Sequence, residues 1–187
     1  MVVGAYGMHP LRDFAIGTCA ERLLHRTDRP VLVVKRKPAG PYRQVLAPVD
    51  FSPDARAAVS LARQVAPNAE LHLLHAFEVA FESKLRFAGV ADEEIHRHRA
   101  QARESAVGGM EQMIAELGIA GAGVSRTITH GYPPRLIAET EKQIGADLVV
   151  IGKHGRSALE DLLLGSVTLH TLAAADCDVL VVPAAGS

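Results

Sequence analysis

The chain has 187 residues, of which 48% are hydrophobic and 22% charged, and its formal net charge is −1 at pH 7. A nearly neutral chain without a basic block lacks the electrostatic surface that binds nucleic acid or an anionic membrane. The chain has only two cysteines, which suits a reducing compartment, so we expect a cytoplasmic protein. We expect neither export nor membrane insertion, because no apolar run approaches the roughly 18 residues that a span needs.

From residue 42 onward, short apolar runs alternate with longer segments of helical character. The runs predict five strands at residues 44–49, 70–77, 124–129, 147–151 and 178–182. The segments between them predict four helices, at residues 53–65, at about 92–117, from the opening residues 131–134 to near Gly145, and at about 166–174. Ser52 and Pro53 fit the N-cap and first position of the first helix.

This alternation predicts a doubly wound α/β domain, in which a parallel sheet is covered by helices on both faces. Ligands of such sheets bind beyond the carboxyl ends of the strands, where the strand order reverses. The loops that follow the strands are therefore the candidate binding site.

Two of these loops carry unusual residues. Asp50 follows the first strand, Gly152 and Gly155 follow the fourth, and Gly165 and Ser166 open the next helix. Glycines let an anion approach the backbone N–H groups, and a helix N-terminus favours negative charge. Ser166 adds a hydroxyl donor, and Asp50 can accept hydrogen bonds from a base or sugar. These residues predict a nucleotide cleft, although neither the Walker spacing nor the dinucleotide fingerprint is present.

These loops lie in segments that resemble the universal stress protein A family. Residues 146–183, ADLVVIGKHGRSALEDLLLGSVTLHTLAAADCDVLVVP, resemble its C-terminal signature, and residues 45–55, VLAPVDFSPDA, resemble its opening. The resemblance implies a complete domain at residues 42–184, with a five-stranded parallel sheet of order 3-2-1-4-5 of the universal stress protein and adenine nucleotide alpha hydrolase type. The first and fourth strands are neighbours in that order, so Asp50 and Gly152 would face one crevice.

In this family the spacing Gly-x2-Gly-x9-Gly-Ser/Thr marks the members that bind ATP, and residues 152–166 have it in full. The resemblance implies ATP, with or without Mg²⁺, as the ligand. Asp50 would contact the adenine or ribose, the residues of the first two strands would line the base pocket, and the glycine loop would hold ribose and phosphates. The implied site consists of Ala47, Pro48, Val49, Asp50, Ala76, Ile151, Gly152, Gly155, Gly165, Ser166 and Val167.

The same spacing occurs a second time, from Gly4 to Thr18, at a constant offset of 148 residues from the copy at Gly152 to Ser166. The offset also matches residues 31–34 with residues 179–182. We interpret residues 1–37 as a partial repeat that holds only the glycine loop, fourth helix and fifth strand, as in an N-terminally truncated tandem protein. We expect no nucleotide site in it, because the counterpart of Asp50 is missing.

Family dimers and tandem pairs join through their fifth strands, so the resemblance implies a homodimer or an internal pseudo-dimer. The segment from Pro30 to Lys35 would lie against the segment from Asp178 to Val182, of the same chain or of a partner, and would cover an exposed sheet edge. Protein partners beyond this contact are not specified by the sequence.

The histidines do not predict a metal site. His72 and His75 should point to opposite faces of a strand, and His96 and His98 should diverge on a helix. His154, inside the glycine loop, could approach a phosphate, but its preferred interpretation is an exposed bystander.

Three further roles near the loop are left open by the sequence. Lys153 and Arg156 are candidates for phosphate contacts, but their positions do not decide the matter. Asp50 could serve as a helix cap, although Ser52 is the better candidate for that role.

No nucleophile is paired with a base, so we expect at most a weak ATPase. The sequence favours an ATP-binding stress-response protein in which the nucleotide regulates contacts with partners. Two alternatives stay open. One is a nucleotide-independent dimeric interaction module that keeps the glycine loop as scaffold, and the other is a slow ATP hydrolase.

Overall fold

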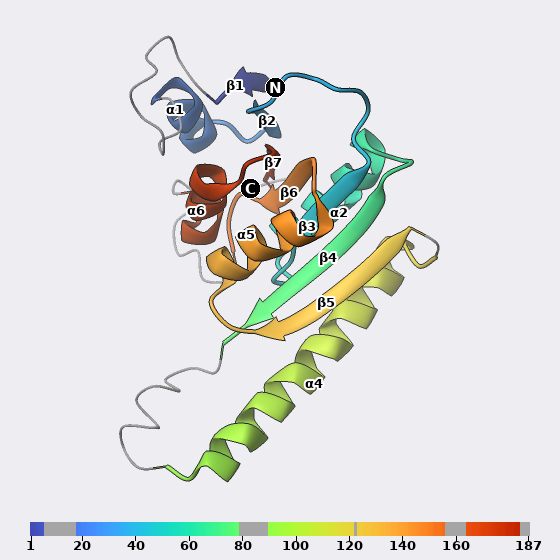
Figure 1. Ribbon diagram of the computed structural model, residues 1–187, viewed down its shortest axis with the longest axis vertical. Coiled ribbons are helices and arrows are strands. Elements are labelled where there is room, and N and C mark those ends of the chain that lie inside the picture. The colour runs from blue at the N-terminus through green and yellow to red at the C-terminus, as the bar shows by residue number, and fades with distance from the viewer. Residues whose placement is uncertain (6–17, 79–89, 122, 156–163, 184–187) are drawn as a thin grey trace.

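A computed structural model of the chain describes residues 1–5, 18–78, 90–121, 123–155 and 164–183 (Figure 1). Its elements, in chain order, are β1 (Val2–Gly4), α1 (Thr18–Arg26), β2 (Val31–Val34), β3 (Gln44–Pro48), α2 (Pro53–Val65), β4 (Glu70–Phe77), α4 (Asp92–Leu117), β5 (Val124–His130), α5 (Pro133–Ile144), β6 (Leu148–Gly152), α6 (Ser166–Ala174) and β7 (Asp178–Val182).

The strands of the described residues form one sheet of order β1-β2-β7-β6-β3-β4-β5. Every neighbouring pair is parallel except β2 and β7. The expected sheet of five strands is therefore too small, because β1 and β2 continue it beyond β7. The physical reason is that β7 would otherwise leave a row of unpaired backbone groups at the edge, and β2 pairs with them.

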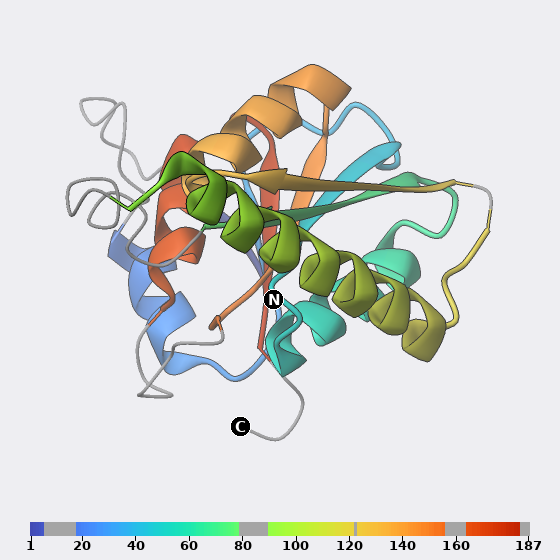
Figure 2. The same ribbon diagram turned by 90° about the horizontal axis from the view of Figure 1, so that it is seen from below.

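Helices cover both faces of the sheet. Figure 2 shows α5 on one side of β4 and β5, and α4 and α2 on the other. The core under α2 and α4 contains Val45 and Ala47, whereas Leu46 belongs to the core under α1, α5 and α6. Successive residues of β3 thus enter opposite cores, as the alternation of a strand requires, and β3 is buried on both faces.

Local signals account for where the helices begin and end. Ser52 caps α2, since its Oγ accepts a hydrogen bond from the backbone N–H of Ala55 at 3.2 Å, and Pro53 is the first helical residue. Both assignments were predicted and are confirmed. Gly118 and Gly145 end α4 and α5 with φ of 61° and 63°, the left-handed conformation that glycine adopts without strain.

The N-terminal segment has the same spacing and register as the last part of the chain. The starts of α1 and α6 lie 148 residues apart (166 − 18), and so do their ends (174 − 26). Val2 pairs with Leu32 in the β1–β2 ladder, as Val150 pairs with Leu180 in the β6–β7 ladder. Gly7 and Gly17, two glycines of the first copy of the spacing, lie outside the described residues.

The pairing of β2 with β7 is symmetric. Leu32 lies opposite Leu180, and the pairs on either side are Val31 with Val181 and Val33 with Val179. Leu32 and Leu180 are also equivalent positions under the offset of 148, so each strand presents the same edge to the other. The sequence left open whether this contact forms within one chain or between two, and in the structure it forms within the chain.

Side-chain hydrogen bonds also attach the N-terminal segment to β7 and α6, in addition to the β2–β7 pairing. The Asp178 carboxylate accepts hydrogen bonds from the backbone N–H of Lys35 at 2.7 Å and of Arg36 at 3.1 Å, and from the Tyr42 hydroxyl at 2.7 Å. The ammonium of Lys35 donates to the carbonyl oxygen of Leu172 at 2.7 Å, near the end of α6. A cation at this position interacts favourably with the helix dipole.

The variant Tyr42→Phe tests this anchor. Burial and the hydrogen bond to Asp178 raise the pKa of Tyr42 above its ordinary value. Because the folded-state pKa is the higher one, the stabilisation is fully present below about pH 10, the ordinary tyrosine value, and falls as the pH rises beyond it. We expect the free energy of unfolding from urea titrations to fall more steeply above about pH 10 in the wild type than in Tyr42→Phe. Equal slopes would contradict the anchoring role.

Candidate functional site

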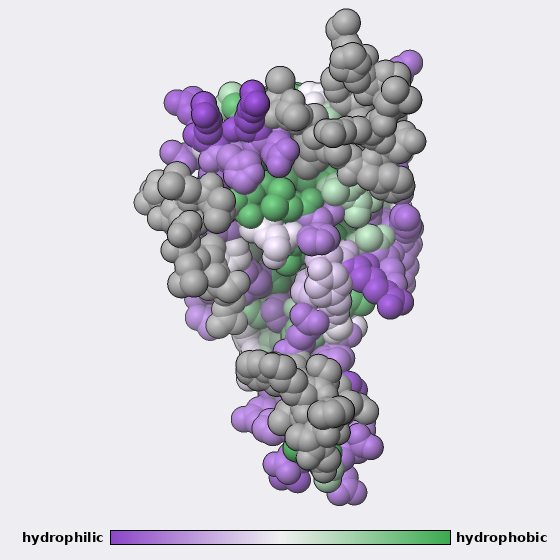
Figure 3. Space-filling view, turned by 90° about the vertical axis from the view of Figure 1, so that its left-hand side faces the viewer, coloured by the Kyte–Doolittle hydropathy of each residue, from purple (hydrophilic) through white to green (hydrophobic). Residues whose placement is uncertain are grey.

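The candidate site lies at the carboxyl ends of β3 and β6, which are adjacent parallel strands. The arrowheads of the parallel strands β4 and β5 point to the lower left of Figure 1, so Figure 3 looks onto this side of the molecule. Hydrophobic residues occupy the middle of the face, and hydrophilic residues lie above them, near α1, and below them, near the start of α4. The loops that meet here follow β3 and β6.

The loop after β3 is held in one conformation by local contacts. Asp50 Oδ1 accepts a hydrogen bond from the Ser52 N–H at 3.0 Å, which closes a tight turn around Phe51. Phe51 has a φ of 65°, an uncommon conformation for a residue with a side chain. Its ring stacks on His75 with a centroid separation of 4.4 Å, and His75 Nδ1 lies 2.7 Å from the Val49 carbonyl oxygen. Sequence reasoning missed the left-handed conformation of Phe51, because it has no local signature. It also missed the contacts of His75, because Phe51 and Val49 lie in the loop after β3 whereas His75 lies on β4.

Asp50 faces the glycine loop. A Cβ atom added to Gly155 would lie 3.0 Å from Asp50 Oδ2, so the Asp50 carboxylate lies directly against the backbone of Gly155. The structure thus brings together two residues that the sequence placed in one site. Asp50 does not cap α2, since Ser52 has that role.

Gly152 has a packing role. A Cβ atom added to it would lie 2.8 Å from Asp54 Cβ and 3.0 Å from the Asp54 carbonyl carbon. Real side chains do not tolerate such distances, so only glycine lets the first turn of α2 rest on the end of β6. Packing alone therefore requires glycine at this position.

Gly165 brings the two ends of the glycine loop side by side. Its N–H donates to the Lys153 carbonyl oxygen at 3.0 Å, and an added Cβ would lie 3.3 Å from the same oxygen. In the first turn of α6, Thr168 Oγ1 donates to the Gly152 carbonyl oxygen at 2.8 Å. Among the residues that the structure describes, no side chain caps α6, where Ser166 is exposed and Val167 is half-buried.

The residues expected to line the base pocket are mostly core residues. Ala47 and Val49 pack under α2, and Ile151 packs in the core on the opposite face. Pro48 is buried as well, whereas Ala76 is half-buried near the end of β4.

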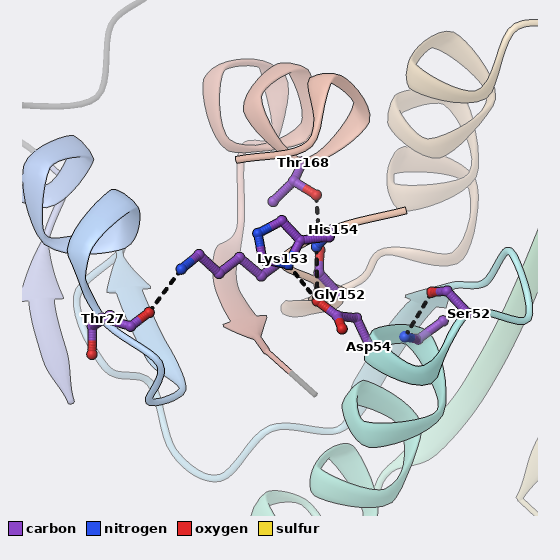
Figure 4. A network of polar contacts seen from close by, with 8 residues as sticks. Thr27, Ser52, Asp54, Gly152, Lys153, His154 and Thr168 are labelled. Atoms are coloured by element: carbon purple, nitrogen blue, oxygen red, sulfur yellow. Dashed lines mark hydrogen bonds and ion pairs between the residues drawn. The ribbon is translucent and has the colours of Figure 1, made fainter. Parts of the chain in front are cut away.

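The structure corrects the interpretation of His154, which is not an exposed bystander. Its backbone N–H donates to Asp54 Oδ2 at 2.9 Å, and its Nδ1 lies 3.1 Å from the same oxygen (Figure 4). The side chains of both residues are only 9% exposed. The prediction was wrong because Asp54 reaches the loop from α2, 100 residues away in the sequence.

The Lys153 side chain extends toward the N-terminal segment. It is buried, and its ammonium donates to the Thr27 carbonyl oxygen at 2.9 Å, just beyond α1 (Figure 4). Thr27 and Ala175 are equivalent under the offset of 148, and the Ala175 carbonyl accepts from Lys35. Each lysine therefore holds the end of a helix in the other segment. Arg156, the second candidate for a phosphate contact, lies outside the described residues.

Within the described ranges, no cluster of three or more His, Cys, Asp or Glu residues is arranged to bind a metal ion. His72 lies 2.7 Å from Ser125 Oγ through Nδ1 and 3.0 Å from Thr127 Oγ1 through Nε2, so it joins β4 to β5. None of the helices described here has the length and apolar character of a membrane span.

Comparison with known proteins gives three consistent similarities. Residues 41–183 match the family model described as the universal stress protein family. Universal stress protein A homolog 2 of Coxiella burnetii is 32% identical over 152 residues, which cover 78% of this chain and 98% of that protein. The solved structure of protein MJ0577 of Methanocaldococcus jannaschii is 29% identical, has a TM-score of 0.67, and is covered completely by 79% of this chain.

A longer relative matches nearly the whole chain. Universal stress protein Rv2005c of Mycobacterium tuberculosis is 25% identical over 185 residues, or 97% of this chain. The match covers 60% of that protein, so this chain spans little more than half of its length.

The variant Gly152→Ala tests the packing of α2 on β6. We expect the added methyl group to push α2 away and lower the free energy of unfolding by about 1–3 kcal/mol, the usual cost of overpacking. Gly108→Ala is the matched control, because Gly108 lies in α4 with open space around it and should gain about 0.5–1 kcal/mol. Denaturant titrations measure both changes, and an unaltered Gly152→Ala protein would refute the close approach.

The variant Lys153→Ala tests the link between the glycine loop and α1. It removes the buried stem and the hydrogen bond to Thr27, so we expect the amides of α1 to exchange hydrogen roughly tenfold faster. Lys142→Ala is the control, because the Lys142 side chain is 67% exposed and should leave α1 unchanged. Identical exchange in α1 for both variants would mean that Lys153 does not hold this segment.

Proposed function

The chain belongs to the universal stress protein family, and we propose that it binds ATP in the crevice between Asp50 and the glycine loop. The observation that carries the proposal is the approach of Gly155 to Asp50, where a Cβ would lie 3.0 Å from Oδ2. A hydrogen-bond acceptor for base or sugar thus stands opposite a backbone that a phosphate can approach closely.

The surroundings of the crevice support this assignment. The N-terminus of α6 receives no cap from a side chain in the described part of the chain, and its dipole and first N–H groups favour a negatively charged ligand. The Ser166 hydroxyl is exposed at this position. The phosphates, with or without Mg²⁺, would lie at this end, and the adenosine would lie toward Asp50.

We further propose that nucleotide binding regulates contacts of the protein with partners. The support is the bond from Lys153 in the glycine loop to Thr27 beside α1, which joins the binding loop to the N-terminal segment. The equal spacing and register of the two segments favour residues 1–37 as a partial repeat and the β2–β7 pairing as a pseudo-dimer contact. The 185-residue match to the longer relative supports the same interpretation.

The test is to purify the protein without added nucleotide, denature it, and identify released small molecules by chromatography and mass spectrometry. We expect stoichiometric ATP or ADP, or else uptake of ATP in a calorimetric titration of the empty protein. Asp50→Ala removes the acceptor, and Gly155→Val places a side chain against Asp50, so both should abolish binding. Asp28→Ala and Gly108→Val are the controls at exposed positions.

A protein that is empty and takes up no ATP would overturn the proposal and favour the nucleotide-independent interaction module. Release of phosphate from ATP above background, lost in Asp50→Ala and Gly155→Val, would instead favour a slow hydrolase.

A further inference from the structure

The buried pair of Asp54 and His154 has a feature that its structural role does not use. Asp54 Oδ2 accepts from both the backbone N–H and Nδ1 of His154, at 2.9 and 3.1 Å. The other ring nitrogen, Nε2, is buried and has no hydrogen-bond partner among the residues that the structure describes. Buried polar atoms of this kind are uncommon in folded proteins and call for an explanation.

The carboxylate determines the state of the ring. Because Asp54 Oδ2 is an acceptor, Nδ1 must carry a hydrogen, and the direction in which Nε2 points is thereby fixed. Carboxylates orient histidines in the same way where the second nitrogen serves a metal or a substrate. An asparagine could make both bonds to Asp54, so the second nitrogen is not needed to hold the loop.

The position of the ring points to an anionic ligand. His154 lies between Lys153, whose carbonyl accepts from Gly165, and Gly155, which faces Asp50. In Figure 4 its ring stands between Asp54 on α2 and Thr168 in the first turn of α6. The pair is thus beside the start of α6, where the N–H groups and the dipole favour a phosphate.

We propose that His154 is a ligand-contacting residue whose Nε2 donates a hydrogen bond to a phosphate oxygen of the bound nucleotide, and that Asp54 is the positioning residue behind it. The inference rests on the proposed function and adds a phosphate contact to the same crevice. Phosphate oxygens are acceptors, so Nε2 carries a hydrogen in the complex. The resulting imidazolium lies between two negative groups, the Asp54 carboxylate and the phosphate.

Two variants of His154 separate the ring nitrogens. In His154→Asn the amide can replace Nδ1 and keep the bond to Asp54, but nothing replaces Nε2. In His154→Gln the longer side chain carries its amide to about the position of Nε2. The affinities for ATP and for adenosine are measured by calorimetry for each protein, because only ATP carries the phosphates. The intact mass of His154→Asn is checked, since asparagine before glycine deamidates.

We expect His154→Asn to bind ATP about tenfold more weakly than the wild type, the effect of losing one hydrogen bond to a charged group, and to bind adenosine unchanged. His154→Gln should recover part of the affinity for ATP. In the wild type, the ¹⁵N signal of His154 Nε2 should shift when ATP is added and stay in place when adenosine is added. His96→Asn, at an exposed position on α4, is the control.

Three outcomes would overturn the inference. If the wild type binds ATP and His154→Asn binds it equally well, the ring has only a structural role. If His154→Asn loses ATP and adenosine to the same extent, the substitution has damaged the loop and Nε2 makes no phosphate contact. If the wild type binds no nucleotide, the proposed function fails first and this inference fails with it.

Discussion

The site depends on one close approach, the contact of the first turn of α2 with the end of β6 at Gly152. Because this residue has no Cβ, the backbone of α2 comes close enough for Asp54 to reach past the strand and bond His154. The same contact brings the loop after β3 to the loop after β6, so Asp50 stands against Gly155. A larger residue at position 152 would separate both pairs at once, which makes this glycine a condition for the crevice as a whole.

A second constraint comes from the edge of the sheet. A parallel sheet that ended at β7 would expose unpaired backbone groups, and β2 covers them in a pairing centred on Leu32 and Leu180. The ladder is short, and the buried Asp178 with the half-buried Tyr42 and Lys35 completes it. Asp178 bonds Tyr42 and two backbone N–H groups, and the ammonium of Lys35 holds the end of α6. These bonds are worth more in the low dielectric of an interface than on an open surface.

The sequence predicted the elements well, because short-range signals determine them. Ser52 and Pro53 begin α2, Gly118 and Gly145 end two helices, and continuous apolar runs mark the buried strands. The candidate site was predicted only in outline. Glycine spacing located the loop, but the roles of Lys153 and His154 depend on partners 126 and 100 residues away, which no local pattern reveals. The same limit explains why the sequence did not reveal that Gly152 also packs against α2.

The glycine loop contacts several separate elements of the molecule. Of four consecutive residues, Gly152 touches the backbone of α2, Lys153 bonds the carbonyl beside α1, His154 bonds Asp54, and Gly155 faces Asp50. A ligand that shifts this short backbone must alter at least one of these contacts, and the contact of Lys153 leads to the segment that lies against β7. If the proposed nucleotide binding weakens or strengthens the contact of the N-terminal segment with β7, then by reciprocity a change in that contact alters the nucleotide affinity by the same free energy. The arrangement thus supplies a physical path, made of named bonds, between an occupied crevice and the edge of the sheet.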